Sequence, residues 1–242
     1  MSERMLGVLS IAFGSMQDQI KIKGKSTCTV KMIACFLRKY SKFILSEIMK
    51  YWSDITLPIP KWFKTWAIDI SKPFPEMDQR MSLVIDLAGI SVKNGGGPFG
   101  AAVFDRHTGE LVAPGVNWVV PGKSSLLHAE VMAMALAEQT LGSYELASHG
   151  SFELVTSVEP CCQCLGVLLW AGVASVVCGA HSEDAQAIGF NEGPRSLHWE
   201  QELKQRGISV TREVMRPQAV EVLQSYIGEI YNSQLQVSNR PG

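Results

Sequence analysis

From about Glu76 onward, the hydrophobic and polar positions of this chain follow regular helix and strand spacings. Between Met77 and Val92, apolar residues recur at the spacing of one helix face, which predicts a helix. Short apolar runs predict strands at residues 99–104, 110–116, 152–156, 174–179 and 207–214. Further helices are predicted at residues 124–141, 161–171 and 218–231.

Glycine-rich turns connect the first of these elements. The run Asn94–Pro98 leads from the first helix into a strand, and Arg106–Gly109 reverses the chain into the next strand. A phosphate loop is not expected at Asn94–Gly97, because such loops follow a strand and open a helix. After this opening hairpin, strands and helices alternate. The pattern predicts a three-layer α/β/α sandwich with a mixed five-stranded sheet.

The first 75 residues lack this order. They combine scattered lysines and apolar patches with four prolines between residues 58 and 75. We expect an N-terminal extension of unassigned role at 1–75, which need not be folded, and a folded domain that contains the functional residues at 76–242. A signal peptide is not expected after the short Met5–Phe13 run. Residues 31–51 could form a basic amphipathic helix at a membrane or partner. A peripheral extension, or a start codon assigned too far upstream, is the simpler interpretation, and no stable membrane association is expected.

Charge and cysteine usage narrow the class of protein. Residues 1–89 hold 13 Lys and Arg against 8 Asp and Glu, a net +5, whereas residues 90–242 hold 9 against 15, a net −6. An acidic functional half argues against a polyanionic substrate and so against a nucleic-acid partner. Three of the six cysteines cluster within four residues, which favours a metal site in a reducing cytoplasm over a disulfide framework.

A split motif carries the chemistry. His128-Ala129-Glu130 is followed by Pro160-Cys161-Cys162-Gln163-Cys164, a pattern of H-x-E and P-C-x-x-C. Zn²⁺ takes imidazole and thiolate ligands, so His128, Cys161 and Cys164 supply three and leave a fourth position for water. Glu130 is left free to move the protons of that water. A structural zinc site would have four protein ligands, so the pattern favours catalysis.

Both halves of the motif lie where a helix is predicted to begin. The partial positive charge of a helix N-terminus lowers the pKa of nearby thiols. Cys161 and Cys164 are three residues apart and share one helix face. Cys162 lies about 100° away around the helix, and we interpret it as a packing residue.

At these residues, the chain resembles the cytidine and deoxycytidylate deaminase superfamily, and within it the bacterial-type guanine deaminases. The resemblance runs from about Glu76 to Tyr231 and is carried also by Gly96–Phe104, Gly115–Asn117 and Ala187–Pro194. It implies that Asn117 hydrogen-bonds a purine, that Phe99 and Phe190 sandwich the ring, and that Glu192 is a second catalytic carboxylate. Guanine presents N1–H and N2–H₂ donors side by side, which an acidic acceptor such as Glu192 matches.

The resemblance implies zinc-dependent hydrolysis of guanine to xanthine and ammonia by a cytoplasmic homodimer. Three alternatives stay open: deamination of another aminated heterocycle or nucleoside, deamination of adenosine in tRNA, and an inactive zinc-binding scaffold. The presence of Glu130 counts against the scaffold. In relatives the tail after Tyr226 closes the site or packs on a partner subunit, but no role is assigned to Tyr231.

Overall fold

The computed structural model describes residues 57–66 and 72–232. The chain divides after Thr56, and all described residues belong to the unit Leu57–Gly242. The interpretations of Met5–Phe13 and of residues 31–51 therefore concern residues outside the described part. Among the helices described, none combines the length and apolar character needed to cross a bilayer.

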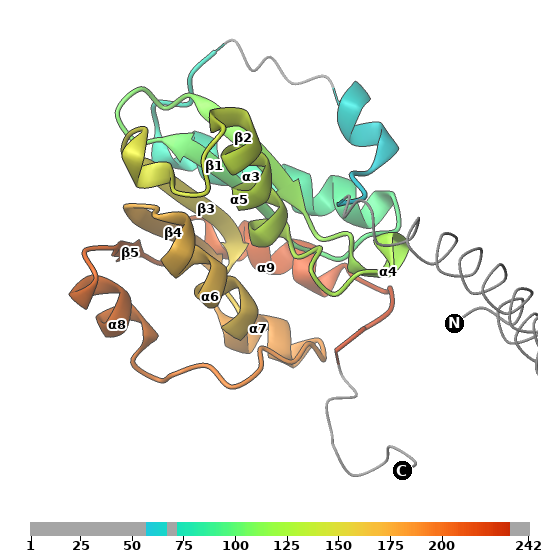
Figure 1. The fold of residues 1–242 in the computed structure, drawn as a ribbon. Helices are drawn as coiled ribbons and strands as arrows, with labels where there is room; N and C mark the ends of the chain where they lie inside the picture. Colours follow the sequence, from blue (N-terminus) through green and yellow to red (C-terminus); the bar gives the residue numbers. More distant parts are fainter. Residues whose placement is uncertain (1–56, 67–71, 233–242) are drawn as a thin grey trace, which may run out of the picture. The chain divides into compact units, whose positions relative to one another are not determined.

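A mixed five-stranded sheet forms the middle layer (Figure 1). Its strands are β1 (Gly100–Asp105), β2 (Leu111–Val116), β3 (Phe152–Val158), β4 (Ser175–Ala180) and β5 (Ser209–Thr211). They lie in the order β2-β1-β3-β4-β5. The strand β1 is antiparallel to both of its neighbours, whereas β3, β4 and β5 are parallel to one another.

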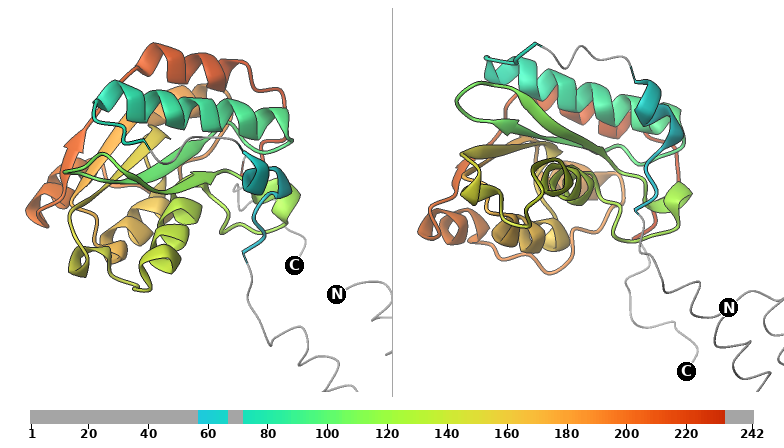
Figure 2. Two further views of the ribbon diagram at one scale, coloured as in Figure 1. Left: turned by 90° about the horizontal axis from the view of Figure 1, so that it is seen from above. Right: turned by 45° about the horizontal axis from the view of Figure 1, so that its top comes forward.

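Helices cover both faces of this sheet (Figure 2). The larger ones are α3 (Met77–Lys93), α5 (Ala129–Leu141), α6 (Cys162–Ala171), α8 (Trp199–Gln205) and α9 (Arg216–Gln224). Ala102 and Phe104 of β1 pack with α3 and α9, while Ala101 and Val103 pack with α5 and α6. Successive residues of a strand therefore fill opposite cores, and each large apolar side chain buried there contributes about 1.5–3 kcal/mol. The predicted three-layer architecture is confirmed.

Several element boundaries differ from the prediction. The helix predicted to begin at residue 124 begins at Ala129, because His128 has the extended backbone of a cap, with ψ 152°. The helix predicted to reach Tyr231 ends at Gln224, four residues before Gly228, a poor helix former. The predicted strand 207–214 shortens to Ser209–Thr211. The helices that were not predicted are η1 (Lys61–Thr65), α4 (Val119–Gly122), η2 (Leu146–Ser148), α7 (Ser182–Ala187) and α8.

Part of the predicted extension packs on the domain. Leu57, Trp62, Phe63 and Trp66 lie against the core that α3 and α9 share with the sheet. The rings of Trp62 and Trp118 meet edge to face, with centroids 6.4 Å apart. Apolar contacts of this kind attach residues 57–66 to the domain.

The residues with chemically reactive or polar side chains gather at one end of the sheet's strands. The strands β2, β3 and β4 run in the same direction, so the residues that follow them, Asn117, Cys161 and His181, lie at the same end of the sheet. Because β1 runs the other way, Phe99, which precedes it, lies at that end too. Ligands of open α/β sheets bind outside the carboxyl ends of the strands, so a site is expected at this end.

Candidate active site

His128, Cys161 and Cys164 form a compact triangle of metal-ligating atoms. The Nδ1 of His128 lies 3.4 Å from the Sγ of Cys161 and 3.5 Å from the Sγ of Cys164, and the two sulfurs are 3.6 Å apart. A tetrahedral Zn²⁺ with Zn–S bonds of about 2.3 Å and Zn–N bonds of about 2.0–2.1 Å sets S···S near ~3.8 Å and S···N near ~3.6 Å. The donor set and its spacing therefore fit zinc.

Helix starts place these three ligands. His128 is the residue before α5, Cys161 is the residue before α6, and Cys164 lies in the first turn of α6. The unpaired N–H groups at the two helix N-termini and their partial positive charge stabilise thiolates and other anions there. A hydrogen bond from the thiol of Cys164 lowers the pKa of Cys161 to about 4, against the opposing effect of burial. Cys161 is thus ready to bind a cation as a thiolate.

Two buried carboxyl groups face the same site. Glu130, two residues after His128, and Glu192 are each 7% exposed. Burial, reinforced by the negative charge of Cys161, raises the pKa of Glu130 to about 7 and that of Glu192 to about 8. A bound cation acts on both in the opposite direction. These pKa values suit groups that exchange protons near neutral pH.

A single pocket brings together the predicted site residues. It is lined by Phe99, Asn117, His128, Glu130, Glu159, Cys161, Phe190, Glu192, Tyr231 and Asn232. Cys164, the remaining predicted ligand, is fully buried beside Cys161. The pocket therefore holds a candidate metal centre, two carboxyl groups, an amide and aromatic rings, which are the parts needed to bind and hydrolyse a heteroaromatic base.

The phenylalanines do not form the expected sandwich. The rings of Phe99 and Phe190 contact each other edge to face, with centroids 4.8 Å apart and an interplanar angle of 81°. Rings in this arrangement leave no slot for a base between them. They form one wall of the pocket, against which a planar ring can pack.

Asn117 is held in place by the glycine-rich turn. A Cβ on Gly97 would come within 2.8 Å of the Oδ1 of Asn117, so the close approach requires glycine. The Nδ2 of Asn117 donates a hydrogen bond of 2.9 Å to the hydroxyl of Tyr231. The run Asn94–Gly97 thus supports a polar side chain of the pocket.

Tyr231, Asn232 and Glu159 were not predicted to belong to the site. The ring of Tyr231 lies 5.9 Å from that of His128 and 5.6 Å from that of Phe190. Asn232 exchanges two hydrogen bonds with the backbone of Asn191, at 3.1 and 2.7 Å. The sequence predicted a helix up to Tyr231, so the turn that brings Tyr231 and Asn232 to the pocket was not expected. Glu159 did give a signal, because a carboxylate beside a buried strand needs partners.

Cys162 lies outside the metal triangle. It is exposed rather than packed in the core, which corrects the sequence prediction. A Cβ on Gly193 would come within 2.4 Å of its Sγ. Cys162 therefore lies at the surface, where the loop that follows Glu192 meets the start of α6.

Comparison with known proteins agrees with this geometry. Residues 75–180 match the cytidine and deoxycytidylate deaminase zinc-binding region. Guanine deaminase of Bacillus subtilis (strain 168) is 39% identical over 97 residues, which are 40% of this chain and 59% of that protein, less than two thirds of its length. A solved structure of guanine deaminase from Nitrosomonas europaea has a TM-score of 0.68 at 39% identity, covering 72% of this chain and 96% of that chain.

A solved complex with 2,6-diaminopurine is similarly close, with a TM-score of 0.69 at 40% identity over 75% of this chain and 98% of that chain. The likeness of fold and sequence thus extends over nearly the whole of these solved chains. The segment that matches the family includes His128, Glu130, Cys161 and Cys164. The chain therefore belongs to the cytidine and deoxycytidylate deaminase family, a family of hydrolases that act on cyclic amidines.

Proposed function

We propose that this protein is a zinc-dependent guanine deaminase, which hydrolyses guanine to xanthine and ammonia. The observation that carries the proposal is Glu192, a second buried carboxyl group in the same pocket as Glu130 and the metal triangle. The similarity to guanine deaminases and to a complex with 2,6-diaminopurine supports it, because guanine and 2,6-diaminopurine share the 2-amino group.

Each residue of the metal site has a defined part in the proposed reaction. His128, Cys161 and Cys164 hold Zn²⁺, which when bound supplies a Lewis acid that lowers the pKa of a water molecule. Glu130 accepts a proton from the water that attacks C2 of guanine and returns it to the ring nitrogen N3. Glu130 then takes the proton of the hydroxyl group on C2 and passes it to the amino nitrogen, so the C2–N bond breaks as the C2 carbonyl forms and ammonia leaves.

The remaining pocket residues recognise the base. Glu192 accepts hydrogen bonds from the N1–H edge of guanine and assists proton transfer. Burial raises the pKa of its carboxyl group to about 8, and a cation bound at the metal triangle opposes that shift and favours the ionised, accepting form. Asn117 donates its amide N–H to an acceptor of the purine, and the wall of Phe99 and Phe190 packs against the ring. Adenine and cytosine lack the adjacent N1–H and N2–H₂ donors, so they leave Glu192 without a donor.

Substrate assays test the proposal directly. The purified protein with zinc would be given guanine, adenosine, cytidine and a tRNA that contains an unmodified target adenosine, and ammonia release would be measured. We expect turnover of guanine above that of all others. Turnover of another substrate with none of guanine would contradict the proposal and favour one of the alternatives.

Glu192→Gln tests the recognition step. The amide keeps the size of the side chain but replaces one acceptor oxygen with a donor that opposes the N1–H of guanine. A buried mismatch of this kind costs about 1–3 kcal/mol, so we expect kcat/KM for guanine to fall by about 10- to 100-fold. The loss is to be confined to guanine, as shown by an unchanged rate with any slower substrate found in the panel. An unchanged kcat/KM for guanine would remove Glu192 from the site.

The tRNA alternative has less support. The half of the chain that contains the motif carries a net −6, whereas binding to a phosphate backbone requires Lys and Arg. The scaffold alternative does not account for Glu130. Burial of its carboxyl group near the metal triangle lowers stability, and a catalytic role explains why such a residue is present.

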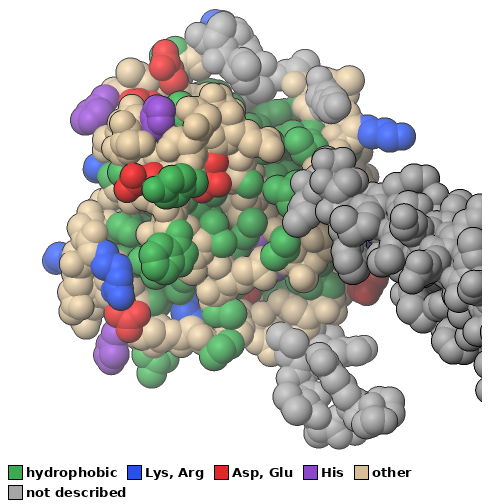
Figure 3. Space-filling view, in the orientation of Figure 1, with side chains coloured by type: hydrophobic (Ala, Val, Ile, Leu, Met, Phe, Trp, Pro, Cys, Tyr) green, Lys and Arg blue, Asp and Glu red, His purple; other side chains and the backbone are tan. Residues whose placement is uncertain are grey.

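A homodimer is proposed from the surface of α6. Leu165, Val167 and Leu169 are partly buried, and Trp170 is 83% exposed. Hydrophobic side chains also show on the face that α5 and α6 cover (Figure 3). An apolar surface of this kind is typical of a protein contact, here a second copy of the chain. Sedimentation velocity is expected to give the mass of a dimer, and a monomer at micromolar concentration would contradict this.

A further inference from the structure

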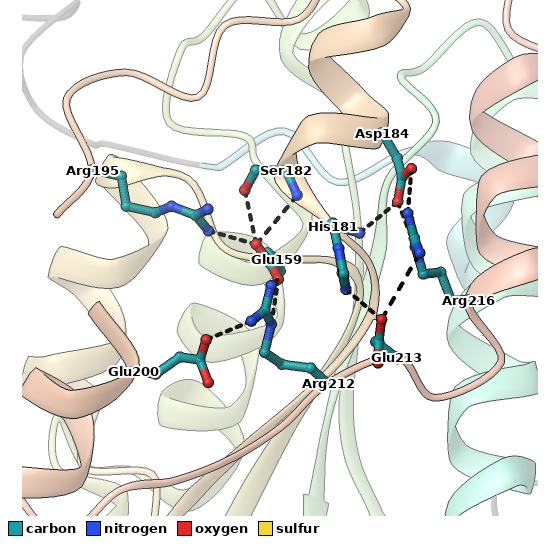
Figure 4. A network of polar contacts seen from close by, with 9 residues as sticks. All are labelled: Glu159, His181, Ser182, Asp184, Arg195, Glu200, Arg212, Glu213 and Arg216. Atoms are coloured by element: carbon teal, nitrogen blue, oxygen red, sulfur yellow. Dashed lines mark hydrogen bonds and ion pairs between the residues drawn. The ribbon is translucent and has the colours of Figure 1, made fainter. Parts of the chain in front are cut away.

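The carboxylate of Glu159 joins several segments around the pocket (Figure 4). Glu159 immediately precedes Pro160 and Cys161, and its side chain is fully buried. Its Oε2 accepts hydrogen bonds from Arg195 at 3.0 Å and from the backbone and hydroxyl of Ser182 at 3.3 and 3.2 Å. Its Oε1 accepts from the Nε of Arg212 at 2.6 Å. This carboxylate therefore has partners on both oxygens.

Glu159 remains an anion in the folded protein. Burial alone would raise the pKa of its carboxyl group, but Arg195, Ser182 and Arg212 together hold that pKa below its usual range. A second acid, Glu200, pairs with Arg212 at 2.6 Å and balances its charge. Desolvation offsets most of the Coulomb energy of a buried ion pair, so net stabilisation explains the arrangement around Glu159 poorly. The arrangement is better explained by the fixed positions that it gives to the segments it joins.

Arg195 connects Glu159 to the loop that carries Glu192. We call residues 190–195 the Glu192 loop. Its carbonyl oxygen at Glu192 accepts a hydrogen bond of 3.0 Å from the backbone N–H of Cys162. Gly193, with φ +70°, lets the loop pass beside the side chain of Cys162. Residues 159–162 and the Glu192 loop are thus joined at two points, a backbone hydrogen bond and the ion pair of Glu159 with Arg195.

The metal ligand Cys161 lies between these two points of attachment. We propose that Glu159 is a positioning residue, which through Arg195 holds the Glu192 loop at a fixed place relative to Cys161. Arg212 and Ser182 orient the same carboxylate but belong to other segments, so they do not hold the loop directly. The inference rests on the proposed function for the part that Glu192 plays in binding guanine.

Two arginines on one carboxylate allow a matched test. Arg195→Gln and Glu159→Gln remove the attachment of the loop, whereas Arg212→Gln removes a neighbouring arginine and leaves the attachment intact. We expect amide hydrogen exchange in peptides covering 189–196 to become at least about tenfold faster in the first two variants and to stay unchanged in Arg212→Gln. Zinc content is expected to stay at one ion per chain in all of them.

Kinetics separate positioning from loss of folded protein. A variant that is partly unfolded has fewer active molecules, which lowers the apparent kcat and leaves KM unchanged. A displaced Glu192 loop weakens contacts with guanine, so KM is expected to rise by about tenfold in Arg195→Gln and by less than about twofold in Arg212→Gln. Equal effects of the two arginine substitutions, or unchanged exchange in Arg195→Gln, would overturn the inference.

The two hypotheses fail in different ways. If the wild-type protein does not deaminate guanine, the proposed function fails, while the exchange measurements still decide whether Glu159 holds the loop. If Glu159→Gln does not fold, Arg195→Gln provides the same comparison, because that side chain is partly exposed and Glu159 keeps Arg212 and Ser182 as partners.

Discussion

Glu130→Gln is expected to abolish deamination while leaving the fold and the bound zinc intact. The amide has the size of the carboxyl group but cannot take a proton from water, and proton transfer of this kind contributes about 10²- to 10⁴-fold. We therefore expect kcat to fall by about 10³-fold. Single-turnover assays of ammonia release would measure this, with zinc content determined on the same samples.

The helix that carries Glu130 also supplies the control. Glu138 lies two turns further along α5, outside the pocket, and Glu138→Gln is expected to change kcat by less than about twofold. Because burial disfavours the charged form of Glu130, Glu130→Gln should not lower the melting temperature. Retained activity in Glu130→Gln would exclude this residue as the proton carrier.

Cys164→Ser is expected to remove zinc and, with it, the activity. Cys164 is fully buried and contributes one of the three ligand atoms, so an oxygen in place of sulfur weakens the site. Substitutions of residues that support a metal ligand lower metal affinity or activity by about 10- to 100-fold, so loss of a ligand itself is expected to lower zinc affinity by more than about 100-fold. The measurement is zinc per chain after dialysis, together with kcat for guanine.

The neighbouring cysteine is a matched control for that experiment. Cys162→Ser makes the same chemical change two residues away, at an exposed side chain outside the metal triangle. This variant is expected to retain zinc and activity. A Cys164→Ser protein that still binds one zinc with full activity would contradict the assignment of the ligands.

The metal triangle could be predicted because its information is local. Histidine and cysteine at the spacings H-x-E and P-C-x-x-C are the residues that zinc chemistry requires, and each half lies at the start of a helix. The alternation of apolar runs likewise predicts the layers of the fold. What the spacing does not contain is the cap conformation of His128, which shifts the start of α5 to Ala129.

The rest of the pocket depends on contacts between distant segments. Tyr231 reaches Asn117 only because the last helix ends at Gln224, and the turn-forming contacts after it do not follow a periodic pattern. The edge-to-face packing of Phe99 and Phe190 is set by where the sheet and a later loop meet. The partners of Glu159 come from three later segments, so its surroundings could not be predicted from its neighbours in the sequence.

The hydrogen bond between Tyr231 and Asn117 makes ligand binding an exchange reaction. A base that accepts this hydrogen bond from the Nδ2 of Asn117 must displace the phenol of Tyr231. The measured affinity is therefore a difference between two similar hydrogen bonds. If the product is the xanthine of the proposed reaction, the phenol competes with it for the same amide and favours its release. Turnover benefits from such a balance, since a pocket that held its product tightly would be slow to accept the next substrate molecule.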